Sequence, residues 1–446
     1  MASPTSQTTI TPHNQTPLVT RTYVSQSELD DIVKRSSEAQ KAWARVPLKD
    51  RLAIATKFVD EFQKMKDEIP LELTLQMGRP VSQIAGEIRG TLERAKYMLS
   101  IAESSLADVG LQDTDKPGFR RFIRRTPLGV VLVIAPWNFP YLTSINSVLP
   151  AIVAGNAVLL KPSPQTPLTA ERLALALHRA GLPENVIQVL HLSPLSHYFQ
   201  RAAVEAPGFK GVALELGGKD PAYVRADADL AYTVAELVDG AFFNSGQSCC
   251  AVEVRLIQTS FLGYRLGDPT KSETNLGPVV SLASAQRIRK QVKDAVEAGA
   301  RALVPEELFL NPETGNLEGT AYVAPQVLVD VNHTMDVMME ETFGPIVGIQ
   351  KVSGDEEATR LMNDSPYGLT ASIWTNAEKD PESQNAFLRL VDELHTGTVF
   401  LNRCDYLDPA LAWVGVKDSG RGISLSKFGY DQLTRAKSVH MKINTS

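Results

Sequence analysis

The sequence is poor in cysteine, with only three in 446 residues: Cys249, Cys250 and Cys404. An odd number with two adjacent members cannot build a regular disulfide framework, so we expect free thiols and a cytoplasmic protein. The spacings CxxC, HxxxH and HExxH are absent as well. Because these spacings supply the common protein zinc sites, no metal site is predicted.

A large excess of charge of either sign is also missing. Lys and Arg number 45 against 51 Asp and Glu, which gives a net charge of −6. The densest basic cluster, Arg120-Arg121 and Arg124-Arg125, is too short for a nucleic-acid patch and is interpreted as a solvated strand. We therefore expect no nucleic-acid partner.

Charged residues are absent from the whole stretch Leu128 to Leu160, which is long enough to span a bilayer. Pro136, Pro140 and Pro150 interrupt it, and several Asn, Ser and Thr residues are spread along it. We interpret it as a buried strand–loop–helix–strand and expect no membrane association. Residues 1–20 are rich in Thr, Ser, Pro and Gln and carry no targeting pattern, which predicts a disordered tail.

The spacing of apolar residues predicts a helical front end followed by two α/β units. Residues 27–65 and 83–107 have the period of helices. Strands and helices then alternate, which favours a doubly wound parallel sheet. The first series comprises a strand at 129–135, a helix at 141–153, a strand at 157–160, a helix at 167–180 and a strand at 186–190. The second comprises a helix at 286–298, strands at 322–328 and 346–352, a helix at 356–363, and strands at 369–375 and 398–401.

Three short segments look chemical rather than structural. Cys249 follows Gly246 and Gln247 in a loop after a predicted helix, where backbone amides can lower a thiol pKa and bind an oxyanion. Asn138 stands in Pro-Trp-Asn-Phe-Pro at the carboxyl end of a buried strand, where ligands bind in open α/β sheets. Glu215 lies among apolar residues in Leu-Glu-Leu-Gly-Gly-Lys, as a general base would. The alternatives are a core thiol, a turn cap and an ion pair.

Together with Glu-Glu-Thr-Phe-Gly-Pro at 340–345, these segments resemble the signatures of the NAD(P)-dependent aldehyde dehydrogenases, in the order of that family. The resemblance runs from about Thr20 to the last predicted strand. It implies an α/β, aldehyde-dehydrogenase-like fold: a Rossmann-type cofactor domain, an α/β catalytic domain and a small oligomerisation unit. The domain bounds that follow are 21–117 with 128–217 for the cofactor domain, 218–418 for the catalytic domain, and 118–127 with 436–446 for strands that join subunits of a homodimer or homotetramer.

The resemblance also assigns roles to single residues. Cys249 corresponds to the nucleophile that forms a thiohemiacetal and then a thioester, and Asn138 to the oxyanion donor. Glu215 corresponds to the base that activates the hydrolytic water. An aldehyde would thereby be oxidised to a carboxylic acid with NAD or NADP. The residues implied for cofactor binding are Trp137, Lys161, Ser163, Gly217, Glu341 and Phe343. Cys250 and Cys404 are left as structural residues.

Two segments of the family are missing from the sequence, and one residue differs from the family pattern. No Phe-Thr-Gly-Ser segment follows Leu190, and by family spacing roughly twenty residues, about one strand–helix unit of a nucleotide fold, are missing there. A second gap of similar size precedes Gly263. Pro164 stands where the family often has a Glu that bonds the ribose, so NAD and NADP both remain open.

These departures keep an alternative open: a spliced or truncated, catalytically impaired or non-catalytic member that retains the fold and the assembly surface. Acyl transfer to coenzyme A is a second alternative, but it tends to dispense with the base, and Glu215 favours hydrolysis. The identity of the aldehyde is open. Arg403, in the segment that corresponds to the substrate tunnel, is interpreted either as a contact for an acidic substrate group or as a salt-bridge partner within the fold.

Overall fold

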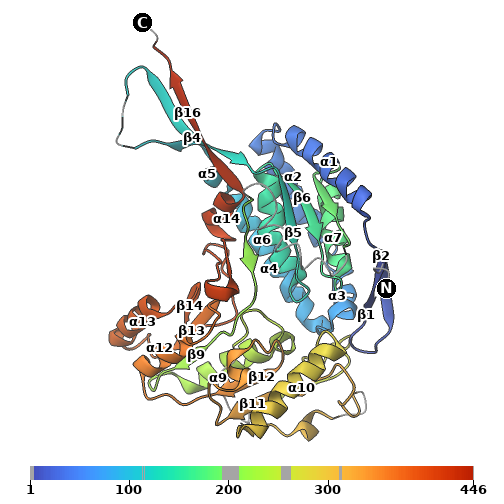
Figure 1. The fold of residues 1–446 in the computed structure, drawn as a ribbon, viewed down its shortest axis with the longest axis vertical. Coiled ribbons are helices and arrows are strands. Elements are labelled where there is room, and N and C mark those ends of the chain that lie inside the picture. The colour runs from blue at the N-terminus through green and yellow to red at the C-terminus, as the bar shows by residue number, and fades with distance from the viewer. Residues whose placement is uncertain are drawn as a thin grey trace.

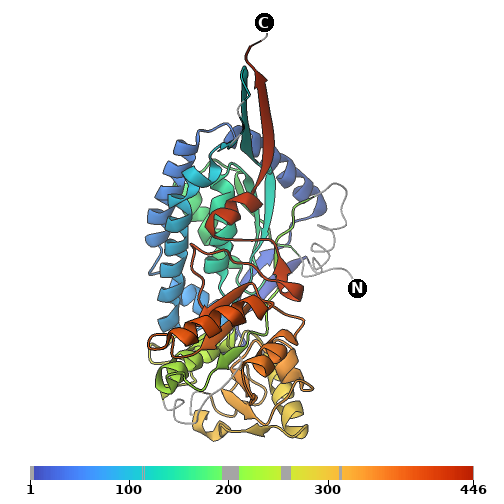
Figure 2. The same ribbon diagram turned by 90° about the vertical axis from the view of Figure 1, so that its left-hand side faces the viewer.

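The computed structural model describes residues 5–112, 114, 116–192, 210–252, 263–310 and 314–444. Figure 1 shows two bodies, one built mainly from the first half of the chain and one mainly from the second. A two-stranded arm made by β4 and β16 stands away from the first body, as Figures 1 and 2 both show. The predicted α/β class is confirmed.

The N-terminal residues form a hairpin of β1 (Ser6–Ile10) and β2 (Pro17–Thr22), which pair antiparallel. Thr9 and Thr11 are buried, and Thr9 Oγ1 donates a hydrogen bond to Pro164 O at 2.8 Å. The predicted disordered tail is therefore wrong for residues 5–20. The composition misled because this hairpin attaches to the body largely through hydrogen bonds, which a count of apolar residues does not register.

The helical front end is confirmed, with one correction to its division. The predicted helix at 27–65 is two helices, separated at Pro47, whose ring nitrogen has no hydrogen to donate and which precedes the first turn of the second helix. Ser25 and Glu28 form a reciprocal capping box at the start of the first helix. The elements are α1 (Gln26–Trp43), α2 (Leu48–Gln63), α3 (Ile69–Met77), α4 (Val81–Ser100) and α5 (Ala102–Leu106).

The first body contains a parallel sheet in the order β5-β6-β7. The central strand β6 is buried throughout, but β5 is an edge of the described sheet and exposes Leu132 (40 %) and Ile134 (47 %). The expectation of a buried strand holds for β6 and is wrong for β5. The strands are β5 (Val130–Ile134), β6 (Ala157–Lys161) and β7 (Ile187–Val189), connected by α6 (Pro140–Val153) and α7 (Pro167–Arg179).

The uncharged stretch is accordingly β5, α6 and β6, as the prolines predicted. In the part of the chain that the structure describes, no helix combines the length and apolar character needed to cross a membrane. Residues 193–209, at the first predicted gap, lie outside the described residues. After that segment, β8 (Leu214–Glu215) pairs antiparallel with β15 (Gly420–Arg421) and, among the described strands, not with the parallel sheet.

The second body confirms the second predicted α/β series. One of its sheets is parallel in the order β14-β13-β9, and the other has the order β10-β11-β12. The strands are β9 (Ala222–Val224), β10 (Arg301–Ala302), β11 (Gln326–Val329), β12 (Ile346–Ile349), β13 (Thr370–Trp374) and β14 (Thr398–Leu401). The helices are α9 (Leu230–Phe242), α10 (Leu282–Glu297), α11 (Asp336–Met339), α12 (Asp355–Asn363) and α13 (Pro381–Glu393).

The arm consists of the two strands predicted to join subunits. β4 (Phe119–Pro127) pairs with β16 (Thr434–Lys442) over their whole length, from Thr434 opposite Pro127 to Lys442 opposite Phe119. The short β3 (Val109–Gly110) lies on the other edge of β4, and α14 (Ser426–Gln432) leads into β16. The strands pair within one chain, and their pairing with a second subunit stays a prediction.

A buried ion pair fixes the turn between β5 and α6. The side chains of Arg79 and Glu87 have no exposed surface and bond each other, and a second nitrogen of Arg79 donates to Asn138 O. Glu87 Oε1 also accepts the backbone N–H of Tyr141 at 2.8 Å. That N–H belongs to the first turn of α6, where no intrahelical acceptor exists and where negative charge is favoured. The Glu87 carboxylate of α4 thus caps α6 and also binds Arg79, which in turn binds the backbone of the turn at Asn138.

Removal of this carboxylate tests how far the first body depends on it. Glu87→Ala leaves Arg79 as a buried charge without compensation, and loss of one member of a buried pair costs about 3–5 kcal/mol. We expect the free energy of unfolding of the first body, measured by urea titration, to fall by that amount. Glu93→Ala, on the exposed side of the same helix, is the control. Equal shifts in the two variants would show that the pair does not hold the turn.

Candidate active site

Cys249 follows a strained turn at the end of α9. The 3-10 turn Phe243–Gly246 contains Asn244 (φ 53°) and Ser245 (φ 55°), both buried and both in the left-handed region. Gly246 also has positive φ (71°), and a Cβ there would lie 2.2 Å from Gly344 O. No side chain fits at that position, so the chain turns sharply and presents Cys249 directly afterwards.

The turn is held by side-chain amides. Asn244 Nδ2 donates to Gln247 O, and Gln247 Nε2 donates to Asn244 O, both at 3.1 Å. Gln247 Oε1 accepts the backbone N–H of Val280 at 2.8 Å. Sequence reasoning noted Gln247 only as a neighbour of the cysteine and did not assign Asn244 any role. Their place in the same signature segment was the signal that could have identified both.

The three cysteines are free and differ in their surroundings. Cys249 is half-buried, whereas Cys250 is buried and donates its S–H to Asp405 Oδ1 at 3.0 Å. A hydrogen bond with Cys249, together with burial and the nearby Asp405, raises the pKa of the Cys250 thiol well above its ordinary value. Burial raises the pKa of Cys404 as well. Cys250 and Cys404 therefore remain thiols, while Cys249 is the accessible member of the adjacent pair.

Asp405 anchors the loop from the opposite side. Its Oδ1 accepts the Cys250 S–H and the Ser248 hydroxyl, the latter at 2.7 Å. Burial raises the pKa of the Asp405 carboxyl, and these two hydrogen bonds oppose that rise. Nothing in the sequence distinguished Asp405 from other acidic residues, because its partners are more than 150 positions away along the chain.

Asn138 lies next to the nucleophile loop. Asn138 is buried, and its carbonyl oxygen accepts from Arg79 and, at 3.4 Å, from Asn244 Nδ2. Gln83, at the start of α4, accepts the backbone N–H of Asn244 at 3.2 Å. The turn after β5 and the loop before Cys249 come from different bodies, and these contacts bring them together.

Glu215 reaches the same place from β8. A Cβ added at Gly218 would lie 3.2 Å from Cys249 O, so the segment that carries Glu215 passes beside the cysteine. Glu215 Oε1 accepts the hydroxyl of Ser424 at 2.9 Å. Glu215 retains solvent-exposed surface, yet desolvation by the protein around its carboxyl raises its pKa. The hydrogen bonds from Ser424 and Trp413 and the charge of Arg94 oppose that rise.

Four of the six predicted cofactor residues form a second group beside the first. The rings of Trp137 and Phe343 meet edge to face, with centroids 5.3 Å apart. Glu341 Oε1 accepts the Gly218 N–H at 3.1 Å, and a Cβ at Gly217 (φ 87°) would lie only 2.4 Å from that oxygen. Burial raises the pKa of Glu341 to about 7. A glycine at 217 is therefore required for this carboxylate to approach the backbone.

Lys161 and Ser163 lie apart from that group, at the carboxyl end of β6. Lys161 is buried, and burial lowers its pKa. Its Nζ bonds Pro162 O at 3.3 Å and forms no ion pair with any residue in the described ranges. Ser163 Oγ accepts the backbone N–H of Gln165 at 3.2 Å. No described hydrogen bond, ion pair or ring contact joins these two residues to the Trp137 and Phe343 rings.

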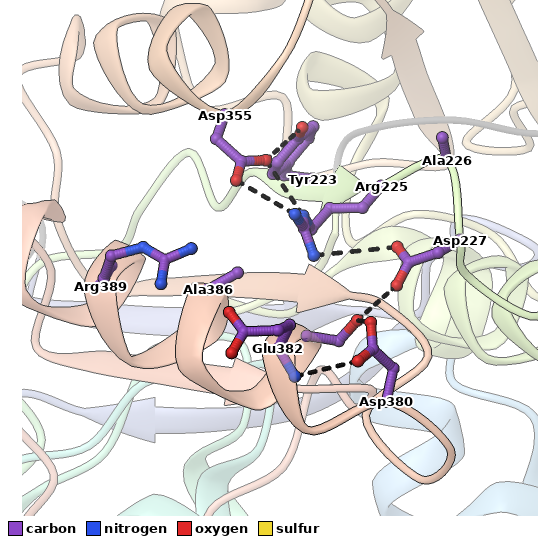
Figure 3. Close-up of a pocket in the computed structure, with 10 residues that line it drawn as sticks. Tyr223, Arg225, Ala226, Asp227, Asp355, Asp380, Glu382, Ala386 and Arg389 are labelled. Carbon is purple, nitrogen blue, oxygen red and sulfur yellow. Dashed lines mark hydrogen bonds and ion pairs between the residues drawn. The ribbon is translucent and has the colours of Figure 1, made fainter.

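A surface hollow on the second body, shown in Figure 3, contains none of the predicted site residues. Several of its polar side chains bond one another: Arg225 Nε pairs with Asp355 at 3.0 Å, and Asp227 accepts the Ser383 hydroxyl at 2.7 Å. Charges that are satisfied internally in this way stabilise the second body and leave little demand for a ligand. The candidate site is the region around Cys249.

Comparison with known proteins leads to one family. The sequence profile described as "Aldehyde dehydrogenase family" matches residues 1–210 and 196–439. Succinate-semialdehyde dehydrogenase [NADP(+)] of Mycobacterium avium is 30% identical over 97% of this chain and 96% of its own length. The crystal structure of NADP-dependent glyceraldehyde-3-phosphate dehydrogenase from Bacillus halodurans, complexed with NADP, is 29% identical, with a TM-score of 0.87 over 98% of this chain and 96% of that one. NAD-dependent aldehyde dehydrogenase from Sinorhizobium meliloti is 27% identical, with a TM-score of 0.88 over 99% and 92%.

The alignments also show that relatives have residues without a counterpart in this chain. The alignment with the Mycobacterium protein spans 466 positions, more than the 446 residues of this chain, so the relative has residues that lack a counterpart here. The profile matches in two pieces that meet at 196–210, where the first gap is predicted. The matches nevertheless cover nearly the whole sequence, and the chain belongs to the aldehyde dehydrogenase family.

Proposed function

We propose that this chain oxidises an aldehyde to a carboxylic acid with NAD⁺ or NADP⁺, through a covalent intermediate on Cys249. The observation that carries the proposal is the convergence of three segments. Asn244 links the nucleophile loop to the Asn138 turn, and Gly218 brings the Glu215 segment beside Cys249. A nucleophile, an amide and a carboxylate from separate elements are the groups that acyl chemistry on a cysteine requires.

In the first step, the Cys249 thiolate attacks the carbonyl carbon, and the carbonyl oxygen acquires negative charge. The Asn138 side-chain amide and the Cys249 backbone N–H are the proposed donors to that oxygen. Asn138 suits this role because its own backbone is fixed by Arg79 and the turn is closed by α6. A donor that is held in place before the reaction loses no free energy to reorientation during it.

The residues predicted for cofactor binding fit a nicotinamide cofactor. Lys161 is a buried ammonium without an ionic partner among the described residues, which suits ribose hydroxyls or a phosphate. Glu341 beside Gly217 and Gly218 offers carboxylate oxygens for the second ribose, and Trp137 and Phe343 offer ring faces. When bound, NAD(P)⁺ would supply the acceptor for the hydride whose loss oxidises the thiohemiacetal to a thioester. Ser163 and Gly217 complete the proposed set.

Hydrolysis of the thioester falls to Glu215. Its carboxylate takes a proton from water, the water oxygen attacks the thioester carbonyl, and the Cys249 thiolate leaves. Ser424 donates to the carboxylate and Arg94 adds positive charge, and both favour its ionised, basic form. Transfer to coenzyme A would need no such base, so hydrolysis is the better supported fate of the thioester.

We also propose the assembly and the location. The arm of β4 and β16 extends from the body, as subunit-joining strands at 118–127 and 436–446 would, and a homodimer or homotetramer would cover it. The proposed domain bounds are those derived from the sequence, with 21–117 and 128–217 for the cofactor and 218–418 for catalysis. Three free cysteines suit the cytoplasm.

The first test concerns the nucleophile. Cys249→Ala should abolish both aldehyde oxidation, followed as NAD(P)H absorbance, and hydrolysis of p-nitrophenyl acetate. Cys250→Ala and Cys404→Ala should keep most of both activities, since their thiols are buried or partly buried and stay protonated. An equal loss in Cys250→Ala, with an unchanged melting temperature, would assign the chemistry to the other sulfur.

The second test concerns the base and its protonation. Glu215→Gln should trap the acyl-enzyme, visible in the intact mass after reaction with p-nitrophenyl acetate. The base works only when ionised, so deacylation should decline as pH falls through a pKa above the ordinary glutamate value of about 4.3. Ser424→Ala removes a hydrogen bond that favours the ionised form, and should therefore move this decline to higher pH. An unchanged pH profile in Ser424→Ala, or free turnover in Glu215→Gln, would exclude Glu215 as the base.

The third test concerns the first gap. The family binds part of the cofactor pyrophosphate with the segment absent after Leu190, and each charge-assisted hydrogen bond lost costs about 1.5–3 kcal/mol, about ten- to a hundredfold in affinity. Calorimetry should therefore show much weaker NAD(P) binding than in a full-length homologue. Insertion of a strand–Phe-Thr-Gly-Ser–helix unit after Leu192 should restore it. Micromolar NAD binding by the unmodified chain would contradict this prediction; binding that stays undetectable after the insertion would favour the non-catalytic alternative.

A further inference from the structure

We propose that Arg94 is the receptor for an anionic group on the aldehyde, so that the preferred substrate carries a carboxylate. This inference deepens the proposed function and rests on it. It assigns the substrate class to a residue of α4, outside the segments in which the sequence suggested catalytic or cofactor roles.

Arg94 is a buried cation whose hydrogen bonds, among the described residues, go to neutral acceptors only. Only 7 % of its surface is exposed, and its Nη1 donates to Leu142 O at 2.8 Å and to Asn146 Oδ1 at 3.3 Å. Both acceptors are neutral groups of α6. A buried guanidinium ordinarily bonds a carboxylate, because burial of an uncompensated charge is costly. Arg79, on the neighbouring stretch of chain, shows the usual arrangement with Glu87.

The other edge of the Arg94 guanidinium is open. Neither Nε nor Nη2 bonds any residue within the described part of the chain, and neither is among its fully enclosed, unbonded polar atoms. These two nitrogens therefore retain contact with solvent. Their N–H groups form the parallel fork that binds the two oxygens of a carboxylate. Beside them, Asn146 Nδ2 is a buried donor that has no acceptor within the described ranges.

The receptor lies near the nucleophile. The charge of Arg94 interacts with Cys250, Glu215, Cys249 and Glu87. Within the described residues, no hydrogen bond or ion pair joins Arg94 to either carboxylate. Cys250 belongs to the same buried cluster as Leu92 and Ala95 of α4, and Cys249 packs against that cluster. Helices α4 and α6 approach closely enough that a Cβ at Gly90 would lie 2.8 Å from Leu142 Cδ2, which fixes Arg94 relative to α6. The open fork thus lies close enough to Cys249 for its charge to act on the thiol.

Two other cations are less suited to this role. Arg79 already bonds Glu87 and the Asn138 carbonyl. Arg403, which the sequence suggested for an acidic group, is exposed and stacks on Tyr406, with its Cζ 3.5 Å from the ring centroid. The two open N–H groups of the Arg94 guanidinium match the two oxygens of a carboxylate.

Alkylation of Cys249 tests the receptor without any cofactor. Iodoacetate and iodoacetamide react with thiols in the same way but differ in charge. Relative to glutathione, the parent chain should favour iodoacetate by about tenfold or more, the effect of one charge-assisted hydrogen bond. Arg94→Gln should remove this preference, and Arg94→Lys should retain part of it. Arg89→Gln, the same change at an exposed position of α4, should leave it intact. The rates are read from peptide masses.

Steady-state kinetics supply the second measurement. Succinic semialdehyde should be oxidised with a kcat/KM about ten- to a hundredfold above that of its methyl ester, and Arg94→Gln should erase the difference mainly through KM. No preference for iodoacetate in the parent chain, or the same preference in Arg94→Gln, would overturn the inference. If the chain oxidises neither aldehyde, the proposed function fails, while the alkylation ratio still decides whether Arg94 binds an anion.

Discussion

The bond between Arg79 and Glu87 is the interaction on which the rest of the site depends. It is fully buried, and each partner also makes a second contact, since Arg79 holds Asn138 O and Glu87 caps α6. A buried ion pair contributes little net stability, because desolvation offsets most of the attraction between the charges. What it contributes here is position. The proposed oxyanion donor is fixed through backbone contacts, so its side chain remains free for substrate.

Much of the fold could be predicted because local patterns determine it. The apolar run at 129–135, the helix after Pro140 and the strand before Pro162 all formed where period and proline placement indicated. The site residues were found through segments in which glycine, proline and amide residues are unusual neighbours. The structure explains one of these patterns directly: at Gly217 and Gly246, a Cβ would collide with Glu341 and with Gly344.

The remaining features depend on contacts between distant residues, which periodicity does not report. Ser424 meets Glu215 across 209 positions, and Asp405 meets Ser248 across 157. In the sequence, Arg94 is indistinguishable from the other charged residues of an amphipathic helix, and only the structure shows that it is buried. The prediction for the N-terminal hairpin was wrong for the opposite reason: its composition is polar, yet the hairpin packs against the first body. Burial of polar groups is decided by their partners, and partners are a property of the fold.

The path of the C-terminal segment has a consequence for the order of synthesis. Tyr430 donates to Met98 O at 2.8 Å, and Asn156 Nδ2 donates to Leu433 O at 3.0 Å, so α14 and the start of β16 close the first body. One edge of β4, near residue 120, likewise stays unpaired until β16, near residue 440, has been synthesised. During synthesis, most of the first body therefore emerges from the ribosome before α14 and β16 exist. Until then it exposes apolar surface and an unpaired strand edge. The nascent chain remains exposed to aggregation until almost its last residue has emerged.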